Sequence, residues 1–490
     1  VVKAIVSARN KKKGGLDDSQ IAALVEQVLA GGGYGGVLDS SNSSLIAALE
    51  TFRDKLAKKG APAGFTGLPG LTGVSRPSAG ADARDEHRPG RPQPAAGQDG
   101  RAALPLLGRV RARLGAHVSG VPLVGADAFR YRLPLVAPLV LPSGTHTERE
   151  GILLRVTAAD GTEGWGEAAP LPGYSDDTLD DVLAELPTEL RIFRERDARL
   201  DGLTLSYEGG GRRPAGRGAL PRPPSLLWAV TQAVSDLSAQ HPGWSLARVY
   251  GWKNRPAATR RDPTLPVVPL NALLPSDDPL PAAGRIAAEG WPAAKLKVGR
   301  RAPEADAALV RQVAGVLGPT RLRLDANRAW SMEEAVAFAR ALGEVPVEYV
   351  EEPLADWRRL PDLALRTGLP FALDESLREL SSRRSRLLTE AAAFVVKPTV
   401  VLADPVFLRF RAGRETPVVV SSTFESGVGM RHLVALAAAL GDTPAGLDTY
   451  RWLADDVLER RLSLAGPTVN VADVLAPNPV RLDRLTRIDL

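Results

Sequence analysis

Apolar positions in the second half of the chain follow two alternating patterns. Short apolar runs alternate with longer segments in which apolar residues recur every three or four positions, which predicts strands followed by amphipathic helices. Eight such pairs in about 200 residues favour a parallel (β/α)8 barrel, and an open doubly wound sheet is the alternative. The predicted strands are Val267–Leu273, Ala294–Val298, Arg321–Asp325, Val347–Glu351, Phe371–Asp374, Phe394–Lys397, Val418–Ser421 and Gly446–Asp448. The predicted helices between them include Pro303–Val316, Met332–Leu342 and Arg431–Leu440.

An α+β pattern precedes this barrel. Residues Phe129–Leu133 alternate, and Gly151–Val156 leads through a turn into Glu163–Glu167, which predicts a hairpin. Helical segments follow around 176–196 and 224–239, separated by a Gly/Arg/Pro-rich insertion at 208–224 that we expect to be a surface loop. The predicted organisation is an α+β capping domain at 127–262, the barrel at 263–450, and a C-terminal segment, 451–490, that packs back on the capping domain.

The N-terminal part of the chain differs in composition. Residues 1–60 predict two short helices, and residues 61–126 are rich in Pro, Gly and Arg, as in linkers that bury little apolar surface. Residues 1–120 hold 17 Lys and Arg against 10 Asp and Glu, so their net charge is +7 and that of the remainder is −2. This extension is a candidate basic arm for binding a partner. It lacks the zinc spacing, aromatic interleaving and recognition helix of sequence-specific nucleic-acid binders.

The overall composition narrows the class of protein. The 490 residues are 44% apolar and 24% charged, which is ordinary for a globular protein. The sequence has no apolar run of roughly 18 residues, so we expect no membrane-spanning helix. The absence of cysteine excludes disulfides, thiolate metal sites and cysteine nucleophiles. With no secretory signal pattern at its start, the chain is expected to be cytoplasmic.

Three carboxylates end three consecutive predicted barrel strands. Asp325, Glu351 and Asp374 are spaced by 26 and 23 residues, so they are expected side by side at the rim where active sites of such barrels form. Clustered acids repel one another unless a cation lies among them, and hard oxygen ligands suit Mg2+, with Mn2+ as a substitute. The alternative is a set of exposed or salt-bridged acids at the starts of loops.

Two lysines flank these acids in the predicted strand order. Lys297 ends the second strand and Lys397 the sixth, and strand alternation places Lys295 on the same face as Lys297. Burial and neighbouring positive charge lower the pKa of a lysine, which would make it a base near neutral pH. The alternative is that these lysines are solvated surface residues.

This constellation resembles the enolase superfamily, in particular the muconate lactonizing enzyme subgroup, over residues 127–485. Within that subgroup, four stretches resemble the o-succinylbenzoate synthase family. They are Gly164–Ser175 (GWGEAAPLPGYS), Asp374–Glu379 (DESLRE), Val396–Thr399 (VKPT) and Ser421–Gly429 (SSTFESGVG). The resemblance implies a capping domain over a modified barrel. It also implies Lys297 and Lys397 as catalytic residues and Asp325, Glu351 and Asp374 as Mg2+ ligands. Candidate substrate-binding residues are Lys295, Arg323, Asn327, Ser421, Ser422, Ser426 and Gly427.

The reaction that this resemblance implies is the dehydration of a small cyclohexadiene carboxylate in menaquinone biosynthesis. Loops of the capping domain around Ser143–Arg149, which includes His146, and Leu171–Ser175 are expected to face the substrate. A racemase or epimerase of N-acylamino acids or dipeptides, or a muconate cycloisomerase, is the alternative, although a single Asp448 stands where epimerases carry two acids. The expected partner is a small-molecule carboxylate, with no specific nucleic acid and no membrane, and the oligomeric state stays open.

Overall fold

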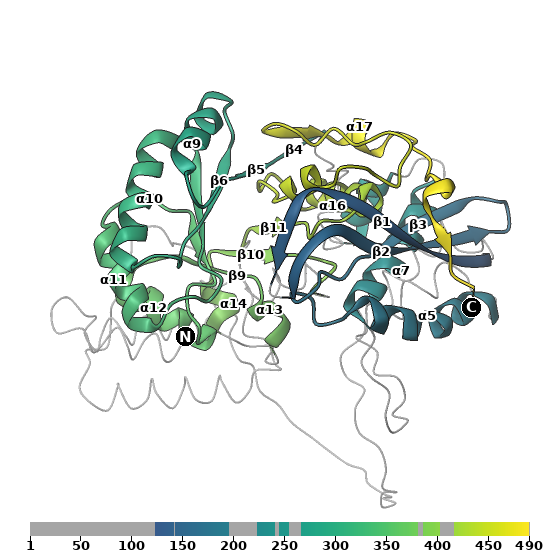
Figure 1. Cartoon of the computed structure of the whole chain (residues 1–490), viewed down its shortest axis with the longest axis horizontal. Helices are drawn as coiled ribbons and strands as arrows, with labels where there is room; N and C mark the ends of the chain where they lie inside the picture. Colours follow the sequence, from purple (N-terminus) through teal and green to yellow (C-terminus); the bar gives the residue numbers. More distant parts are fainter. Residues whose placement is uncertain are drawn as a thin grey trace, which may run out of the picture. The chain divides into compact units, whose positions relative to one another are not determined.

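The computed structural model describes residues 123–141, 143–195, 223–240, 245–253, 266–380, 386–401 and 416–489, within one compact unit, Gly100–Leu490 (Figure 1). The predictions for residues 1–60, for 61–122 and for most of the insertion at 208–224 lie outside the described residues. Among the described helices, none is both long enough and apolar enough to cross a membrane.

The first layer is an antiparallel sheet whose strands are ordered β13-β1-β2-β3. Its strands are β1 (Leu123–Leu141), β2 (Gly144–Ala158), β3 (Glu163–Ala168) and β13 (Thr486–Arg487), so the end of the chain returns to the capping domain. Its helices are α5 (Leu179–Glu195), α7 (Pro224–Ala239) and α8 (Leu246–Lys253).

Two glycines of the GWGE motif bring β3 against α7. A Cβ on Gly164 would collide with the carbonyl oxygen of Ala233, and one on Gly166 with that of Ala229. Both glycines are therefore required by close packing of a strand on a helix backbone.

Two boundaries of the capping domain differ from the prediction. Strand β1 begins at Leu123, so the linker prediction extends four residues too far. Residues 143–149, predicted as a loop, are almost wholly part of β2. His146 and Thr145 of this strand pair with Leu139 and Val140 of β1. This stretch is polar and lacks the alternation of apolar and polar residues that predicts a strand. It is extended because it pairs with the apolar end of β1.

The second half of the described chain contains a parallel sheet of strands ordered β11-β10-β9-β8-β7-β6-β5. Ala445 and Gly446 hydrogen-bond to both edges of this sheet, since Asn271 N donates to Ala445 O and Gly446 N donates to Val420 O. This two-residue segment takes the place of an eighth strand and connects the two edges. The strands are β5 (Asn271–Leu273), β6 (Ala293–Lys297), β7 (Arg321–Asp325), β8 (Tyr349–Glu351), β9 (Phe371–Leu373), β10 (Ala393–Val396) and β11 (Val418–Val420).

Helices follow the strands, and in Figure 1 helices α9 to α12 run along one side of β6 to β9. Helix α11 coincides with its prediction because Ser331 and Glu334 form a capping box and Gly343 follows its last residue. The helices are α9 (Pro279–Ala288), α10 (Pro303–Leu317), α11 (Met332–Leu342), α12 (Leu360–Thr367), α13 (Ser376–Glu379), α14 (Arg386–Glu390), α16 (Gly427–Leu440) and α17 (Val471–Leu475).

The first and eighth predicted strands are shorter than expected. The first is divided at Leu270: β4 (Val267–Pro269) pairs with β12 (Thr468–Asn470), and only β5 joins the parallel sheet. The eighth was predicted at Gly446–Asp448, but Asp448 already begins a 3-10 helix, Asp448–Trp452. Prolines explain part of this difference, since neither Pro269 nor Pro444 has an N–H to give to a ladder.

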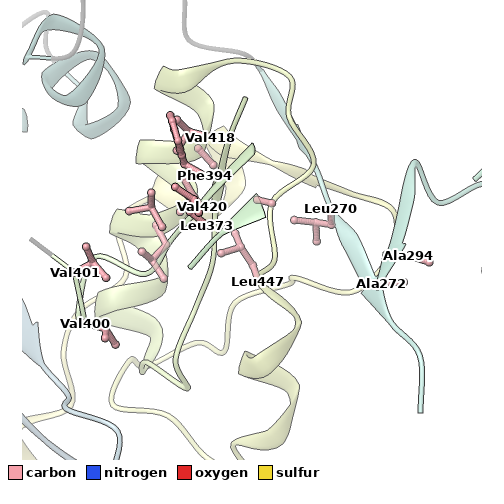
Figure 2. Packing of buried hydrophobic residues seen from close by; sticks show 14 of the residues in the cluster. Leu270, Ala272, Ala294, Leu373, Phe394, Val400, Val401, Val418, Val420 and Leu447 are labelled. Carbon is pink, nitrogen blue, oxygen red and sulfur yellow. The ribbon is translucent and has the colours of Figure 1, made fainter. Parts of the chain in front are cut away.

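One apolar core connects the two halves. It contains Phe129 and Tyr131 of the capping sheet together with the strands and helices of the barrel. Figure 2 shows part of it, where Leu373, Phe394, Val418 and Val420 from β9, β10 and β11 gather together. The carboxyl ends of these strands therefore project from a packed base, which holds the side chains at the rim in place.

Candidate active site

The three predicted carboxylates lie at the ends of adjacent strands. Asp325 is the last residue of β7 and Glu351 the last of β8, and the two are paired in register. Asp374 follows directly after β9. All three side chains are buried, so their negative charges require compensation within the protein.

Two lysine ammonium groups lie between these carboxylates. Lys295 Nζ is 2.9 Å from Asp325 Oδ2 and 3.1 Å from Glu351 Oε2. Lys397 Nζ contacts Asp374 Oδ2 and is 3.9 Å from Glu351 Oε1. The lysine side chains are only 14% and 12% exposed, respectively, so both are part of the buried cluster.

The pKa values of the cluster reflect this mutual arrangement. Burial disfavours the ammonium form of Lys397, but Asp374 and Glu351 outweigh burial and hold its pKa above the usual range. The same balance, with Asp325 and Glu351, raises the pKa of Lys295. The expectation that burial lowers the lysine pKa is wrong for these two lysines, because contact with carboxylates dominates.

The carboxylates are unequally compensated. Burial works to raise the pKa of Asp325, but Lys295 and Lys297 outweigh it and the pKa is lowered. Burial and the charge of Asp325 raise the pKa of Glu351 well above its usual value. Three carboxyl groups thus crowd around two ammonium groups, and a negative charge on Glu351 is the one that this crowding disfavours.

The crowding of three carboxyl groups and the all-oxygen donor set fit a hard divalent cation such as Mg2+. As they stand, no three Asp, Glu or His side chains among the described residues converge on one point as metal ligands do. Lys295 and Lys397 lie beside these carboxylate oxygens and contact them. Asp325, Glu351 and Asp374 are the residues that would hold it.

Lys297 lies in different surroundings. It ends β6, its side chain is exposed, and its Nζ donates to Asn327 Oδ1 over 3.1 Å. Its register partner on the neighbouring strand β7 is Asp325. Lys297 ends β6 and Lys397 directly follows β10, so the two lysines lie on either side of the three carboxylate-bearing strands.

Comparison with known proteins agrees with this geometry. Residues 281–476 match the family model "Enolase C-terminal domain-like", and residues 124–204 match "MenC, N-terminal domain". The o-succinylbenzoate synthase of Edwardsiella ictaluri is 31% identical over 342 residues, which cover 68% of this chain and 92% of that protein. The chain belongs to the o-succinylbenzoate synthase family. Accordingly, it is an enzyme of the enolase superfamily.

Other relatives and structures extend the comparison. The o-succinylbenzoate synthase of Thermobifida fusca is 39% identical over 49% of this chain and 71% of that protein. The chloroplastic protein PHYLLO of Arabidopsis thaliana is 31% identical over 69% of this chain, which spans only 22% of PHYLLO. Among solved structures, muconate lactonizing enzyme from Pseudomonas fluorescens has a TM-score of 0.59 at 18% identity, covering 74% of this chain and 98% of that one. That likeness shows the shared fold.

In this member of the o-succinylbenzoate synthase family, Tyr174 also reaches the cluster. Its hydroxyl donates to Asp374 Oδ2 over 3.0 Å and accepts from Lys397 Nζ over 3.0 Å. We expected the loop Leu171–Ser175 to face the site but assigned no role to Tyr174. Its position in a motif shared with the family was the available signal, whereas its partners are about 200 residues away in sequence.

Backbone strain is concentrated at the same edge. The described non-glycine residues with positive φ are Asn327 (45°), Arg328 (60°), Glu352 (42°) and Phe424 (63°). Each follows a barrel strand at its carboxyl end. Such strained residues cluster at active sites, where the surrounding structure holds them in place.

Two predicted substrate-binding residues have a different role in the structure. Ser426 N and Oγ donate to Glu167, and Gly427 N donates to Asp456 over 2.8 Å. Gly429 N also donates to Glu167, over 2.8 Å, and a Cβ at Gly429 would lie 2.6 Å from Glu167 Oε2. The Ser-Gly turn is therefore the N-terminus of α16, built to receive carboxylates of the protein. The expectation that Ser426 and Gly427 donate to substrate is wrong, because these donors are engaged.

Arg323 is likewise part of the core. Its side chain is 1% exposed, and it pairs with Glu348 at 2.6 Å and donates to Pro444 O over 2.8 Å. It lies one pleat below Asp325 on β7, so the prediction that it contacts substrate is wrong.

Ser421 and Ser422 lie where β11 meets the Ala445–Gly446 segment. Both hydroxyls donate to Gly446 O, over 3.3 and 3.1 Å, and Ser422 Oγ is also 2.6 Å from Thr449 Oγ1. Ser421 is half-buried and Ser422 is buried. Their contact with substrate stays a prediction, as does that of Lys295 and Asn327.

Proposed function

We propose that this chain is an o-succinylbenzoate synthase, which dehydrates 2-succinyl-6-hydroxy-2,4-cyclohexadiene-1-carboxylate to 2-succinylbenzoate. The observation that carries the proposal is the row of Asp325, Glu351 and Asp374 at consecutive strand ends, with Lys297 and Lys397 on the strands to either side. The reaction breaks the C–H bond next to the ring carboxylate and the C–O bond of the neighbouring hydroxyl, and it makes the ring aromatic.

Lys297 is the proposed base. The Lys297 Nζ donates to the neutral amide of Asn327 rather than to a carboxylate. The Lys297 side chain is exposed at the mouth of the barrel, where substrate enters. A neutral Lys297 amine takes the proton, and the electron pair enters the carboxylate as an enediolate. The same Lys297, now protonated, then gives that proton to the departing hydroxide, so the only product besides 2-succinylbenzoate is water.

Lys397 is the proposed electrostatic residue. It is buried and held by Asp374, so it stays charged and offers a fixed positive group to the enediolate. A divalent cation on Asp325, Glu351 and Asp374, Mg2+ by donor chemistry, supplies further neutralisation of the substrate carboxylate when bound. Lys295 contacts both Asp325 and Glu351 and holds these two side chains close together.

A racemase or epimerase of the same superfamily is the alternative, since two bases on opposite sides of one carbon exchange a proton between faces. The asymmetry between Lys397, which is buried against carboxylates, and Lys297, which is exposed, favours one base and one fixed cation, as a dehydration needs.

The test is an assay of the purified protein with Mg2+ on the cyclohexadiene substrate, on N-acylamino acids and on dipeptides. Formation of 2-succinylbenzoate is followed by its aromatic absorbance and by mass spectrometry, and racemisation by loss of optical rotation. Turnover of the cyclohexadiene that disappears with EDTA and returns with Mg2+ is the expected result. Racemisation without dehydration would replace the proposal with its alternative.

A further inference from the structure

Tyr174 connects the capping domain to the catalytic cluster through its hydroxyl. The hydroxyl is 3.0 Å from Asp374 Oδ2 and 3.0 Å from Lys397 Nζ, donating to the first and accepting from the second. Lys397 Nζ also lies 5.3 Å from the centroid of the Tyr174 ring. A phenol is the side chain that provides an acceptor for an ammonium group, a donor for a carboxylate and an aromatic face at the same time.

The Tyr174 loop is itself fixed to the barrel. Arg378, in α13 just after Asp374, donates to the backbone oxygen of Tyr174 over 3.0 Å and pairs with Asp176 at 2.8 Å. Its guanidinium lies 5.6 Å from the Tyr174 ring centroid. Ser175 Oγ accepts from Leu171 N over 2.8 Å, which tightens the turn. The phenol is thus held by two groups from the barrel and by its own loop.

The arrangement assigns a distinct task to the hydroxyl. Lys397 has two kinds of partner, the carboxylates and the neutral phenol. Asp374 is also a proposed cation ligand, so its carboxylate is shared, whereas the phenol has no such competing role. We propose that Tyr174 is a positioning residue that holds the Lys397 ammonium group in its catalytic place, and that Arg378 holds Tyr174. This inference rests on the proposed function for its kinetic consequence, but the restraint on Lys397 is measurable without it.

The kinetic test compares Tyr174→Phe with Tyr250→Phe. Phenylalanine keeps the ring and loses the hydroxyl. Tyr250 is a matched control because it is a buried tyrosine whose hydroxyl is 2.9 Å from His432 Nδ1, in the packing between α8 and α16. We expect Tyr174→Phe to lower kcat about tenfold to a hundredfold, as for loss of a hydrogen bond to a charged group, with KM changed less than about threefold. Tyr250→Phe should leave both unchanged.

A purely structural role for Tyr174 predicts a different result. In that case Tyr174→Phe would lower Tm and weaken Mn2+ binding, measured by electron paramagnetic resonance, while kcat of the folded enzyme stayed near wild type. That outcome would overturn the inference.

The readout that does not depend on catalysis is the reactivity of Lys397. Wild type, Tyr174→Phe and Tyr250→Phe are treated briefly with acetic anhydride, and peptide mass spectrometry gives the rate of Lys397 acetylation relative to Lys297. We expect the Lys397 rate to rise severalfold in Tyr174→Phe alone. Equal rates in all three proteins would overturn the positioning role. If Lys397 acetylation rises in Tyr174→Phe but the wild-type protein does not dehydrate the cyclohexadiene, the positioning role stands and the proposed function is wrong.

Arg378→Met gives a second route to the same answer if Tyr174→Phe folds poorly. It removes the groups that fix the Tyr174 loop and leaves the hydroxyl in place. We expect the same changes in kcat and in Lys397 acetylation, smaller in size, and a double variant that is less than additive because both residues act through one contact. Full additivity would mean that Arg378 and Tyr174 act independently, against the proposal.

Discussion

The two lysines that flank the carboxylate row end comparable strands but lie in opposite surroundings. Lys397 is buried, contacts Asp374 and the Tyr174 hydroxyl, and approaches Glu351. Lys297 is exposed and has one neutral hydrogen-bond partner, Asn327. The same residue type at the same kind of position is therefore fixed and charged on one side and accessible on the other. Their surroundings assign them different parts of a proton-transfer reaction.

The largest expected effect comes from Lys297→Ala. Without its base the enzyme should lose about 10⁴-fold in kcat, the upper range for general acid–base catalysis. Because Lys297 is exposed, the free energy of unfolding should stay within about 0.5 kcal/mol of wild type. The measurements are steady-state kinetics and urea unfolding. Comparable turnover in this variant would end the assignment of the base.

Lys397→Met should reduce kcat about 10²- to 10³-fold, since it removes an electrostatic group aimed at developing charge. In contrast to Lys297→Ala, it should also destabilise the fold by about 3 kcal/mol, because Asp374 and Glu351 are left as buried like charges. Urea unfolding of both variants side by side measures the contrast. Equal stability of the two variants would contradict the asymmetry between the lysines.

Metal affinity sharpens the same comparison. Lys397→Met removes a positive charge in contact with Asp374, so Mn2+ should bind about tenfold more tightly than to wild type. Lys297→Ala, whose charge lies beside Asp325 without an ion pair, should change the affinity about twofold. Titration followed by electron paramagnetic resonance gives both values. Weaker binding in Lys397→Met would show that Lys397 orders the ligands rather than competing for them.

The smallest effect is expected at the neutral partner of Lys297. Asn327→Gly keeps the positive φ of 45° accessible and removes the amide, so kcat should fall about fivefold, the value of one ordinary hydrogen bond. Asn327→Ala is the matched variant, with the same lost amide and added backbone strain. Similar kcat values in both, with a lower Tm for alanine alone, would separate the two contributions. No change in kcat would show that the Asn327 amide does not orient Lys297.

The barrel was predictable because its information is local. Each strand that carries a site residue is a short apolar run, and helix α11 has an N-cap signal at Ser331 and a C-cap glycine at Gly343. Asp325, Glu351 and Asp374 come together because parallel strands end at one edge of a sheet. The eighth strand was overestimated because two residues, Ala445 and Gly446, complete the hydrogen bonding of both edges.

The partners of individual side chains were not predictable, because they are distant in sequence. In the sequence, Ser426 lies in a Gly-rich turn, which is compatible with ligand binding. In the structure its N–H and hydroxyl donate instead to Glu167, 259 residues away. Arg323 alternates in phase with Asp325, yet one pleat places it in the core. The pKa of Lys397 is raised because Asp374 and Glu351 together outweigh burial, and no spacing rule contains that balance.

The carboxylate of Glu167 also has a consequence for how the molecule divides. It belongs to strand β3 of the capping sheet, yet it receives the amides of Ser426 and Gly429 at the start of a barrel helix. Separation of the halves would leave a buried anion without donors and a helix terminus without an acceptor. A chimera that joins the cap of one relative to the barrel of another would have to keep Glu167 together with its donors at the start of α16. The two halves are therefore expected to be exchanged together rather than separately.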